Sequence, residues 1–370
     1  MFENLNISDD MKPSDPRFGS GPSLVPVEFV EKLLLTGQNL LGTSHRKLPI
    51  KNLVKEAQDG LRKYFSLPDD YKVVLGNGGA TFLFDMIGLG MVKKKSAHFT
   101  CGEFSEKWFK SHNKIPWIEA EQISVPFGQG IDGEDVADAD MVCVTLNETS
   151  TGVQISKLPE VDEGTILAVD ATSGGGQIAC DVSKTDLFFF SPQKVFASEG
   201  GLFVAIMSPK AYNRALEMAD GDNYSPVIMS WELAINNSDK NQTYNTPAIA
   251  TIFFLNEQIK LMNEVGYSKA CEMAEEKAQL LYSWAEEKDY LSCYVEEAKY
   301  RSRSVATINV DESFPVGPLI NWLAEKKIIY NIDGYRKLGQ NQFRIAMFHN
   351  IKYDDLNKLK DIISMAIEAT

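Results

Sequence analysis

Short apolar runs alternate with helical or loop sequence through the first half of the chain, and this alternation limits the fold most strongly. Strands that are buried on both faces are apolar throughout, and connections of helical length place successive strands parallel. The runs that we predict as such strands are 72–75, 97–100, 122–125, 141–146, 165–170 and 187–190. The run at 202–207 follows too closely for a helical crossover, so we expect it to pair antiparallel. The sequence therefore predicts an α/β fold around a mostly parallel sheet.

One lysine and one aspartate stand at the ends of two of these runs. Lys194 comes just after the run at 187–190, and Asp170 is the last residue of the run at 165–170. Ligands of such sheets bind at the carboxyl ends of the strands, so both side chains are expected at one edge. An amine under apolar cover can lose its proton and act as a nucleophile, whereas a buried carboxylate needs a cationic partner. A lysine that forms an imine and an aspartate that holds a pyridinium nitrogen are the working pair of a pyridoxal-phosphate enzyme.

A glycine-rich loop, GNGGAT at 76–81, lies between the strand expected at 72–75 and a helix expected at 82–92. Backbone N–H groups are free at a helix N-terminus, and the helix dipole there favours an anion. The loop matches neither the Walker pattern nor GxGxxG, so nucleotide binding is not supported. Such a loop alone is often only a turn, and the stronger argument for a ligand site is the convergence of several strand ends. The residues at or just past those ends are Thr81, Phe104, 147–149, Asp170 and Lys194.

The charge of the chain excludes some classes of partner. Its net charge of −14 at pH 7 argues against nucleic acids and against anionic membrane surfaces. An anionic ligand would therefore need a local basic pocket. A short basic stretch, His45 to Lys47, is on composition alone a solvated loop. Arg344 lies inside an apolar strand, where a guanidinium usually pairs with a carboxylate of the protein or of a substrate.

The cysteines and the N-terminus indicate a soluble, cytoplasmic protein. The five cysteines are scattered without a CxxC pair, which indicates reduced thiols and neither a disulfide framework nor a zinc site. The four histidines show no ligand spacing, so we expect no metal. The first residues are acidic and polar, unlike a secretory or transit peptide, and the apolar runs are too short to span a bilayer.

The remaining segments predict a large and a small domain. Residues 1–17 are expected to form an irregular arm, residues 18–255 the large domain, and residues 256–370 a small C-terminal α+β domain. The segment 225–246 is turn-rich and polar. Helices are expected at 27–37, 53–65, 249–264, 267–287, 318–326 and 356–367, and further strands at 305–310, 328–332 and 343–347.

A set of motifs extends through most of the chain, from Phe18 to the C-terminus. They are GSGPSLVP near the start, TSHR at 43–46, GNGGAT at 76–81, CGEFSEKW at 101–108, NETSTG at 147–152, VDATS at 169–173, SPQK at 191–194, YNTP at 244–247 and FRIAMF at 343–348. In this order the set resembles that of the phosphoserine aminotransferases, which are class V, fold-type I aminotransferases. The resemblance implies a large domain with a mostly parallel seven-stranded sheet, helices on both of its faces, and a small C-terminal α+β domain.

The resemblance implies pyridoxal 5'-phosphate as the cofactor. Lys194 would form the imine with it and move the proton between the substrate Cα and the cofactor. Asp170 would hold the pyridinium nitrogen, and we expect a low pKa for this carboxylate because it faces a cation. The further cofactor-binding residues implied are Gly79, Ala80, Thr81 and Gln193 at the phosphate, Phe104 stacked on the ring, and Thr149 near the ring hydroxyl.

The resemblance also implies a homodimer with shared active sites. Asn245 and Thr246 would reach the cofactor phosphate of the other subunit. The substrate-binding residues implied are His45 and Arg46 for the substrate phosphate and Arg344 for the α-carboxylate. The chain departs from the commonest pattern in VFASEGG after the lysine and in the basic stretch at 335–337, where Arg336 is the candidate for a second phosphate ligand. Both features are similar to a divergent, actinobacterial-like branch.

The implied reaction transfers the amino group of L-glutamate to 3-phosphohydroxypyruvate, giving O-phospho-L-serine and 2-oxoglutarate in serine biosynthesis. One alternative is another class V aminotransferase, such as an alanine–glyoxylate-type enzyme. A cysteine desulfurase would want a histidine before the lysine, where this chain has Gln193, and a nucleophilic cysteine on a mobile loop. The intact pair of Lys194 and Asp170 argues against a catalytically silent protein that only binds the cofactor.

Overall fold

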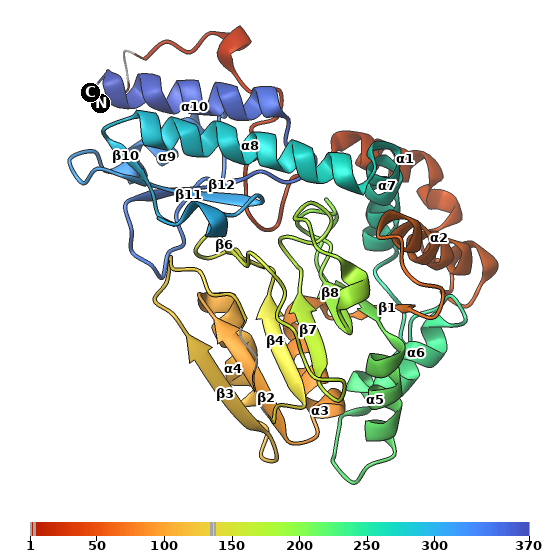
Figure 1. Cartoon of the computed structure of the whole chain (residues 1–370). Helices are drawn as coiled ribbons and strands as arrows, with labels where there is room; N and C mark the ends of the chain where they lie inside the picture. Colours follow the sequence, from red (N-terminus) through yellow and green to blue (C-terminus); the bar gives the residue numbers. More distant parts are fainter. Residues whose placement is uncertain (1, 3–4, 134–135, 137, 370) are drawn as a thin grey trace.

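The structure is a computed structural model that describes residue 2, residues 5–133, residue 136 and residues 138–369. The strands of its large sheet are β1 (Lys72–Asn77), β2 (Lys95–Thr100), β3 (Glu119–Ser124), β4 (Met141–Thr145), β7 (Ile166–Asp170), β8 (Leu187–Phe190) and β9 (Leu202–Met207). They form one seven-stranded sheet in the order β1-β9-β8-β7-β4-β2-β3 (Figure 1). The pairs from β8 to β3 are parallel, whereas β9 is antiparallel to both of its neighbours. The predicted sheet and the antiparallel pairing of 202–207 are therefore confirmed.

Helices cover both faces of this sheet. One face carries α3 (Gly79–Met91), α4 (Glu103–His112), α5 (Pro209–Ala219) and α6 (Trp231–Ser238), and the other carries α2 (Leu48–Tyr64) and α7 (Ile249–Val265), with α1 (Val27–Thr36) beside α7. Strand β8 reaches the cores on both sides. Leu187 and Phe189 lie in the core with α3 and α4, and Phe188 and Phe190 lie in the core on the opposite face. Burial on both faces explains why this strand is apolar without interruption.

The C-terminal part has a three-stranded antiparallel sheet of β10 (Leu291–Cys293), β11 (Val305–Val310) and β12 (Gln342–Ala346). Helices α8 (Tyr267–Glu287), α9 (Val316–Glu325) and α10 (Tyr353–Glu368) pack with it, and their core is continuous with that of the large sheet. A short hairpin, β5 (Asn147–Glu148) and β6 (Val153–Gln154), lies between the two sheets (Figure 1). The N-terminal segment lies against α10, where Ser14 donates from its backbone N–H and its hydroxyl to Asp355 at 2.6 and 2.7 Å.

Two local predictions are wrong. Residues 328–332 form no strand, because Lys327 and Asn331 adopt left-handed backbone conformations with φ of 58° and 63°, and only Tyr330 makes an isolated bridge, to Arg17. The turn-rich segment 225–246 contains α6, which begins where the hydroxyl of Ser230 accepts from the N–H of Leu233 at 3.2 Å. The predicted division of the chain at residue 256 stays a prediction, and this residue lies within α7.

Among the residues that the structure describes, no helix is both long enough and apolar enough to cross a membrane.

Candidate active site

A pocket of about 370 Å³ lies at the carboxyl edge of the parallel strands, between the large sheet and the C-terminal part. This edge is where α/β sheets bind their ligands. The predicted site residues that line it are Gly79, Ala80, Thr81, Phe104, Thr149, Asp170, Gln193, Lys194 and Arg344. Lining residues to which the sequence analysis gave no individual role are Ser20, Gly21, Pro22, Thr145, Thr172, Ser173, Ser191, Gly200, Gly201 and Tyr335.

Lys194 is the buried amine of this pocket. Its side chain is 7% exposed, and its Nζ donates to the hydroxyl oxygen of Thr149 at 2.7 Å. Burial lowers the pKa of the Lys194 amine to about 8, although the negative charges of Asp170 and Glu148 act in the opposite direction. Roughly a tenth of the amine is therefore neutral at pH 7, far more than of an ordinary lysine, and the neutral form is the one that a nucleophile requires.

The chain approaches Lys194 closely from its N-terminal side. Gly21 has a φ of 146°, and a Cβ there would lie 2.7 Å from Cε of the lysine. Any side chain at position 21 would displace the side chain of Lys194, so this position requires glycine. The GSGP motif contained this signal, but the sequence alone did not show which side chain required the glycine.

Asp170 ends β7 inside the pocket. One carboxylate oxygen accepts from the backbone N–H of Thr172 at 3.0 Å and from its hydroxyl at 2.5 Å. Among the groups of the protein, burial has the largest effect and raises the pKa of Asp170, while Thr172 and Lys194 oppose that shift. The direction is opposite to the low pKa that we expected, because that expectation depended on a cationic ring nitrogen. A buried carboxylate with so little compensation is suited to a cationic ligand atom.

A hydroxyl network holds Thr149 in place. Its hydroxyl donates to Ser173 at 2.9 Å, and the hydroxyl of Ser173 donates to the carbonyl oxygen of Asn147 at 2.9 Å. The side chain of Asn147 donates to the same serine hydroxyl at 2.9 Å. The orientation of Lys194 is thus fixed through Thr149 by two loops that leave neighbouring strands.

The start of α3 forms a cradle for an anion. Gly78 and Gly79 have φ of 128° and 75°, so the glycines themselves form the entry to the helix, which begins earlier than the predicted 82–92. Gly78 donates to the carbonyl oxygen of Gly201 at 3.0 Å, which ties the loop to the one that follows Lys194. The N-terminus of this 13-residue helix and its dipole suit a phosphate.

Buried polar atoms without a partner test whether the pocket fits the cofactor that the resemblance implies. Several pocket residues have such an atom within the described chain. They are Thr145 (Oγ1), Asn147 (Oδ1), Gln193 (Oε1) and Arg344 (Nε). Buried polar atoms are ordinarily hydrogen-bonded, so these atoms indicate a polar ligand. The pocket therefore combines an anion cradle, a lone carboxylate, an amine and an aromatic face. Together these groups fit pyridoxal phosphate.

Aromatic and basic side chains form one side of the pocket. The Phe104 ring centre lies 5.0 Å from Nζ of Lys194, and Tyr335 lies 6.3 Å from Phe104. The Arg344 guanidinium lies over the Tyr335 ring at 5.3 Å, and its contact with the Thr149 carbonyl oxygen is long, at 3.4 Å. Among the described residues no carboxylate forms a salt bridge with Arg344, so this guanidinium is available to a ligand.

The other predicted residues do not line the pocket. His45 and Thr246, distant in sequence, meet at 3.3 Å between Nδ1 and Oγ1, and Asn245 and Arg46 are exposed beside them. Arg336 is exposed next to Tyr335. The guanidinium groups of Arg46 and Arg336 make no hydrogen bond or ion pair within the described part of the chain.

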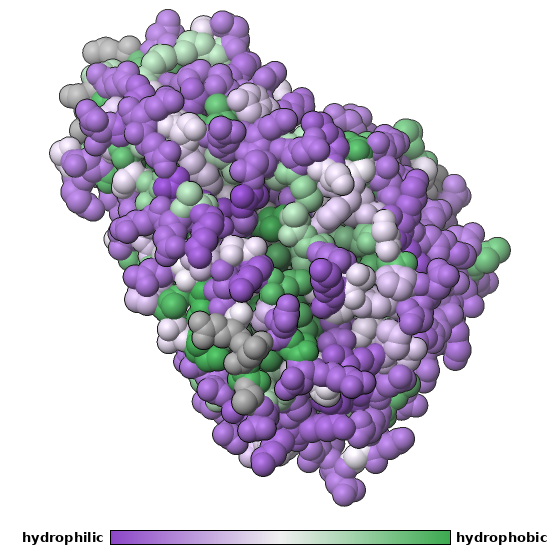
Figure 2. Space-filling view, in the orientation of Figure 1, coloured by the Kyte–Doolittle hydropathy of each residue, from purple (hydrophilic) through white to green (hydrophobic). Residues whose placement is uncertain are grey.

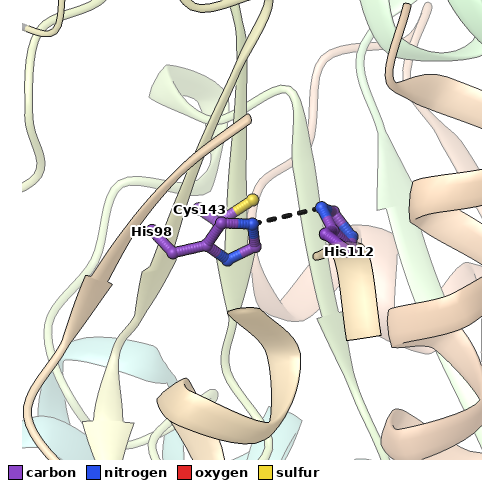
Figure 3. Close-up of side chains that lie close together, drawn as sticks. All are labelled: His98, His112 and Cys143. Carbon is purple, nitrogen blue, oxygen red and sulfur yellow. Dashed lines mark hydrogen bonds between the residues drawn. The ribbon is translucent and has the colours of Figure 1, made fainter. Parts of the chain in front are cut away.

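A second group of side chains, His98, His112 and Cys143, has atoms that could ligate a metal, and Figure 3 shows the three together. His98 Nε2 lies 3.1 Å from His112 Nδ1. Trp108 donates to His112 Nε2 at 3.1 Å, so the other ring nitrogen carries the proton of the neutral ring and points to His98. Burial lowers the pKa of His98 well below its ordinary value and that of His112 to about 3. A neutral hydrogen-bonded chain therefore accounts for this cluster, and we assign no metal to it.

Comparisons with known proteins agree with this geometry. A family model, Aminotransferase class-V, matches residues 132–334. The chain is 39% identical to a phosphoserine aminotransferase of Rhodococcus opacus over 98% of this chain and 97% of that one, and 40% identical to one of Corynebacterium glutamicum over 100% and 98%. The crystal structure of a phosphoserine aminotransferase from Cytophaga hutchinsonii superposes with a TM-score of 0.86 at 26% identity, covering 95% of this chain and 99% of that one.

The fold and the site define a pyridoxal-phosphate-dependent aminotransferase of fold type I. Within that class, the chain belongs to the phosphoserine aminotransferase family of the class V aminotransferases.

Proposed function

We propose that the protein transfers the amino group of L-glutamate to 3-phosphohydroxypyruvate, which gives O-phospho-L-serine and 2-oxoglutarate. The observation that carries this proposal is the buried Lys194 amine, held by Thr149 in a pocket that also contains Asp170 and Arg344, which has no carboxylate partner among the described residues. The full-length relatives named phosphoserine aminotransferase support the same reaction.

Different residues of the chain would have different roles in the reaction. When bound, pyridoxal phosphate supplies an electron sink for the charge that develops at the substrate Cα. The cradle at Gly79 to Thr81 would hold its phosphate, and Asp170 would hold its ring nitrogen. Lys194 Nζ, with its pKa of about 8, would accept and return the Cα proton as a general base and acid. Thr149 keeps this nitrogen at one place in the pocket.

Substrate recognition requires two anion sites. Arg344 would bind the α-carboxylate, since a planar guanidinium holds a carboxylate bidentately. His45, Arg46 and Arg336 would bind the distal anion, and this assignment is supported by both guanidinium groups, which have no hydrogen bond or ion pair with any residue that the structure describes. Arg301 and Arg303 are less suitable, because they already pair with Glu286 and Glu275.

The active site would be completed by a second copy of the chain. Exposed apolar side chains lie on α1, on the segment that leads to α2 and on the first residue of α2, at Val27, Val30, Leu34, Leu35, Leu41 and Leu48. Most of the face in Figure 2 is hydrophilic, and at the right, where α1 and α2 lie in Figure 1, the hydrophobic side chains that show in this view are isolated. An exposed apolar surface of this kind suits a protein interface. His45 and Thr246, which meet nearby, would then reach the site of the partner.

The test is a comparison of kcat/KM for amino donors with 2-oxoglutarate as the acceptor. O-phosphoserine should exceed serine and alanine by roughly 100-fold or more, because each charge-assisted hydrogen bond to a distal anion contributes about 1.5–3 kcal/mol. An alanine–glyoxylate-type enzyme would instead prefer alanine with glyoxylate, and that outcome would replace the proposal. The cytoplasmic location stays a prediction.

A further inference from the structure

Glu148 is a fully buried carboxylate that none of the roles above uses. It lies in the short strand β5 and is 0% exposed. Its oxygens accept from the backbone N–H groups of Phe104 and Ser105 at 3.1 and 2.9 Å and from the Ser105 hydroxyl at 3.0 Å. They also accept from the N–H and the hydroxyl of Ser150 at 3.2 and 2.7 Å. Within the described chain its hydrogen-bond partners are backbone and hydroxyl groups, and no lysine or arginine forms a salt bridge with it.

Two of these donors belong to the first turn of α4. Phe104 and Ser105 are its second and third residues. The side chain of an N-cap residue ordinarily accepts hydrogen bonds from the N–H groups at these two positions. The residue at the N-cap of α4 is Gly102, which has no side chain to do so. A Cβ at Gly102 would lie 2.3 Å from Cγ of Glu148. Gly102 therefore leaves the space that the Glu148 side chain occupies, and Glu148, which is distant in sequence, caps the helix in its place.

The capped turn carries the aromatic residue of the pocket. The backbone N–H that Glu148 binds is that of Phe104, whose ring centre lies 5.0 Å from Lys194 Nζ. The charged groups that act on this amine are Asp170 and Glu148, which favour its protonated form, and Arg344 and Lys107, which disfavour it. Glu148 therefore affects the site both through the position of a ring and through its charge.

We propose that Glu148 is a positioning residue of the active site, which caps the first turn of α4, holds the Phe104 ring beside Lys194 and places a negative charge within electrostatic range of the Lys194 amine. This inference rests on the proposed function for the identity of the cofactor. It requires no particular substrate.

The test compares Glu148→Gln and Glu148→Asp with a control, Glu106→Gln, in the purified holoenzyme. Glu106 lies on the same turn of α4 but faces Lys110. The readouts are the pH midpoint at which the absorbance of the bound cofactor changes and the fraction of cofactor kept after dialysis. The glutamine variant should lower the midpoint by roughly half a pH unit or more, because a nearby negative charge is lost. It should also lose the cofactor roughly 10-fold faster, because the amide has one acceptor oxygen where the carboxylate uses two, so either the donors of α4 or those of Ser150 lose their acceptor.

The aspartate variant separates the two effects, since it keeps the charge but is one methylene shorter. It should keep the midpoint and still lose the cofactor faster, while Glu106→Gln should match the unchanged protein in both. A lower melting temperature with an unchanged midpoint and unchanged retention in both Glu148 variants would show a merely structural residue and overturn the proposal. If the glutamine variant does not fold, the aspartate variant decides, and normal retention there would overturn the proposal. Neither outcome bears on which keto acid is the substrate.

Discussion

The amine of Lys194 lies 2.7 Å from the hydroxyl oxygen of Thr149, which in turn donates to Ser173. This chain of contacts fixes the nitrogen that is expected to carry the cofactor, in a pocket where burial has already lowered its pKa. The two residues come from loops 45 positions apart. Their approach is a product of the parallel sheet, whose strand ends meet at one edge.

Removing the hydroxyl of Thr149 should therefore slow the reaction. A hydrogen bond to a charged group contributes about 1.5–3 kcal/mol, so Thr149→Val should lower kcat by roughly 10- to 150-fold. Thr149→Ser keeps the hydroxyl and is the matched control. Single-turnover kinetics measure the effect, and equal rates for the valine and serine variants would contradict the account.

Lys194→Ala should bind pyridoxal phosphate through the cradle and Asp170 but form no covalent link. After borohydride treatment, peptide mass spectrometry should find the reduced adduct on Lys194 in the unchanged protein and on no residue of the variant. An adduct on another lysine would show that the cofactor-bearing residue is misassigned.

The pH dependence of cofactor uptake follows from the pKa of Lys194. Only the neutral amine attacks the cofactor, and a pKa of about 8 leaves roughly a tenth of it neutral at pH 7. The rate of recombination of the cofactor-free protein with pyridoxal phosphate should therefore rise with pH and level off above about pH 8. Stopped-flow absorbance measures this rate. A rise that continues to pH 10 would mean that burial does not lower the pKa.

Substitutions of Arg46 and Arg344 should differ in the amino acids whose kcat/KM they lower. Arg46→Ala should lower kcat/KM for O-phosphoserine and glutamate by roughly 10- to 150-fold and leave alanine unchanged, because alanine has no distal anion. Arg344→Ala should lower kcat/KM for all three amino acids. If Arg46→Ala lowered kcat/KM equally for alanine and O-phosphoserine, Arg46 would not be the phosphate ligand, and Arg336 would take its place in the assignment.

The proposed sharing of each active site between two subunits predicts complementation between inactive variants. Lys194→Ala has an intact Asn245 and Thr246, and the double variant Asn245→Ala/Thr246→Ala has an intact lysine. Dimers re-formed from a mixture should regain one functional site per heterodimer. Heterodimers that exist but remain inactive would place Asn245 and Thr246 in the site of their own subunit.

The sequence predicted those features that depend on one strand, helix or loop at a time. Apolar runs specified the strands, and the residues just past them, such as Asp170 and Lys194, line one pocket. Features that depend on contacts between distant segments were not predictable. Gly21 is required by the side chain of Lys194, and Glu148 caps a helix that begins 45 positions earlier. The strand expected at 328–332 failed because the left-handed backbone of Asn331 leaves no mark in the apolar pattern.

The most direct test of the central claim follows the amino group itself. Purified protein is incubated with 15N-labelled L-glutamate and 3-phosphohydroxypyruvate, and the products are resolved by NMR. The account predicts that the label appears in O-phosphoserine, that unphosphorylated hydroxypyruvate receives it far more slowly, and that Lys194→Ala transfers none. Label transfer at equal rates to both keto acids, or transfer by Lys194→Ala, would contradict it.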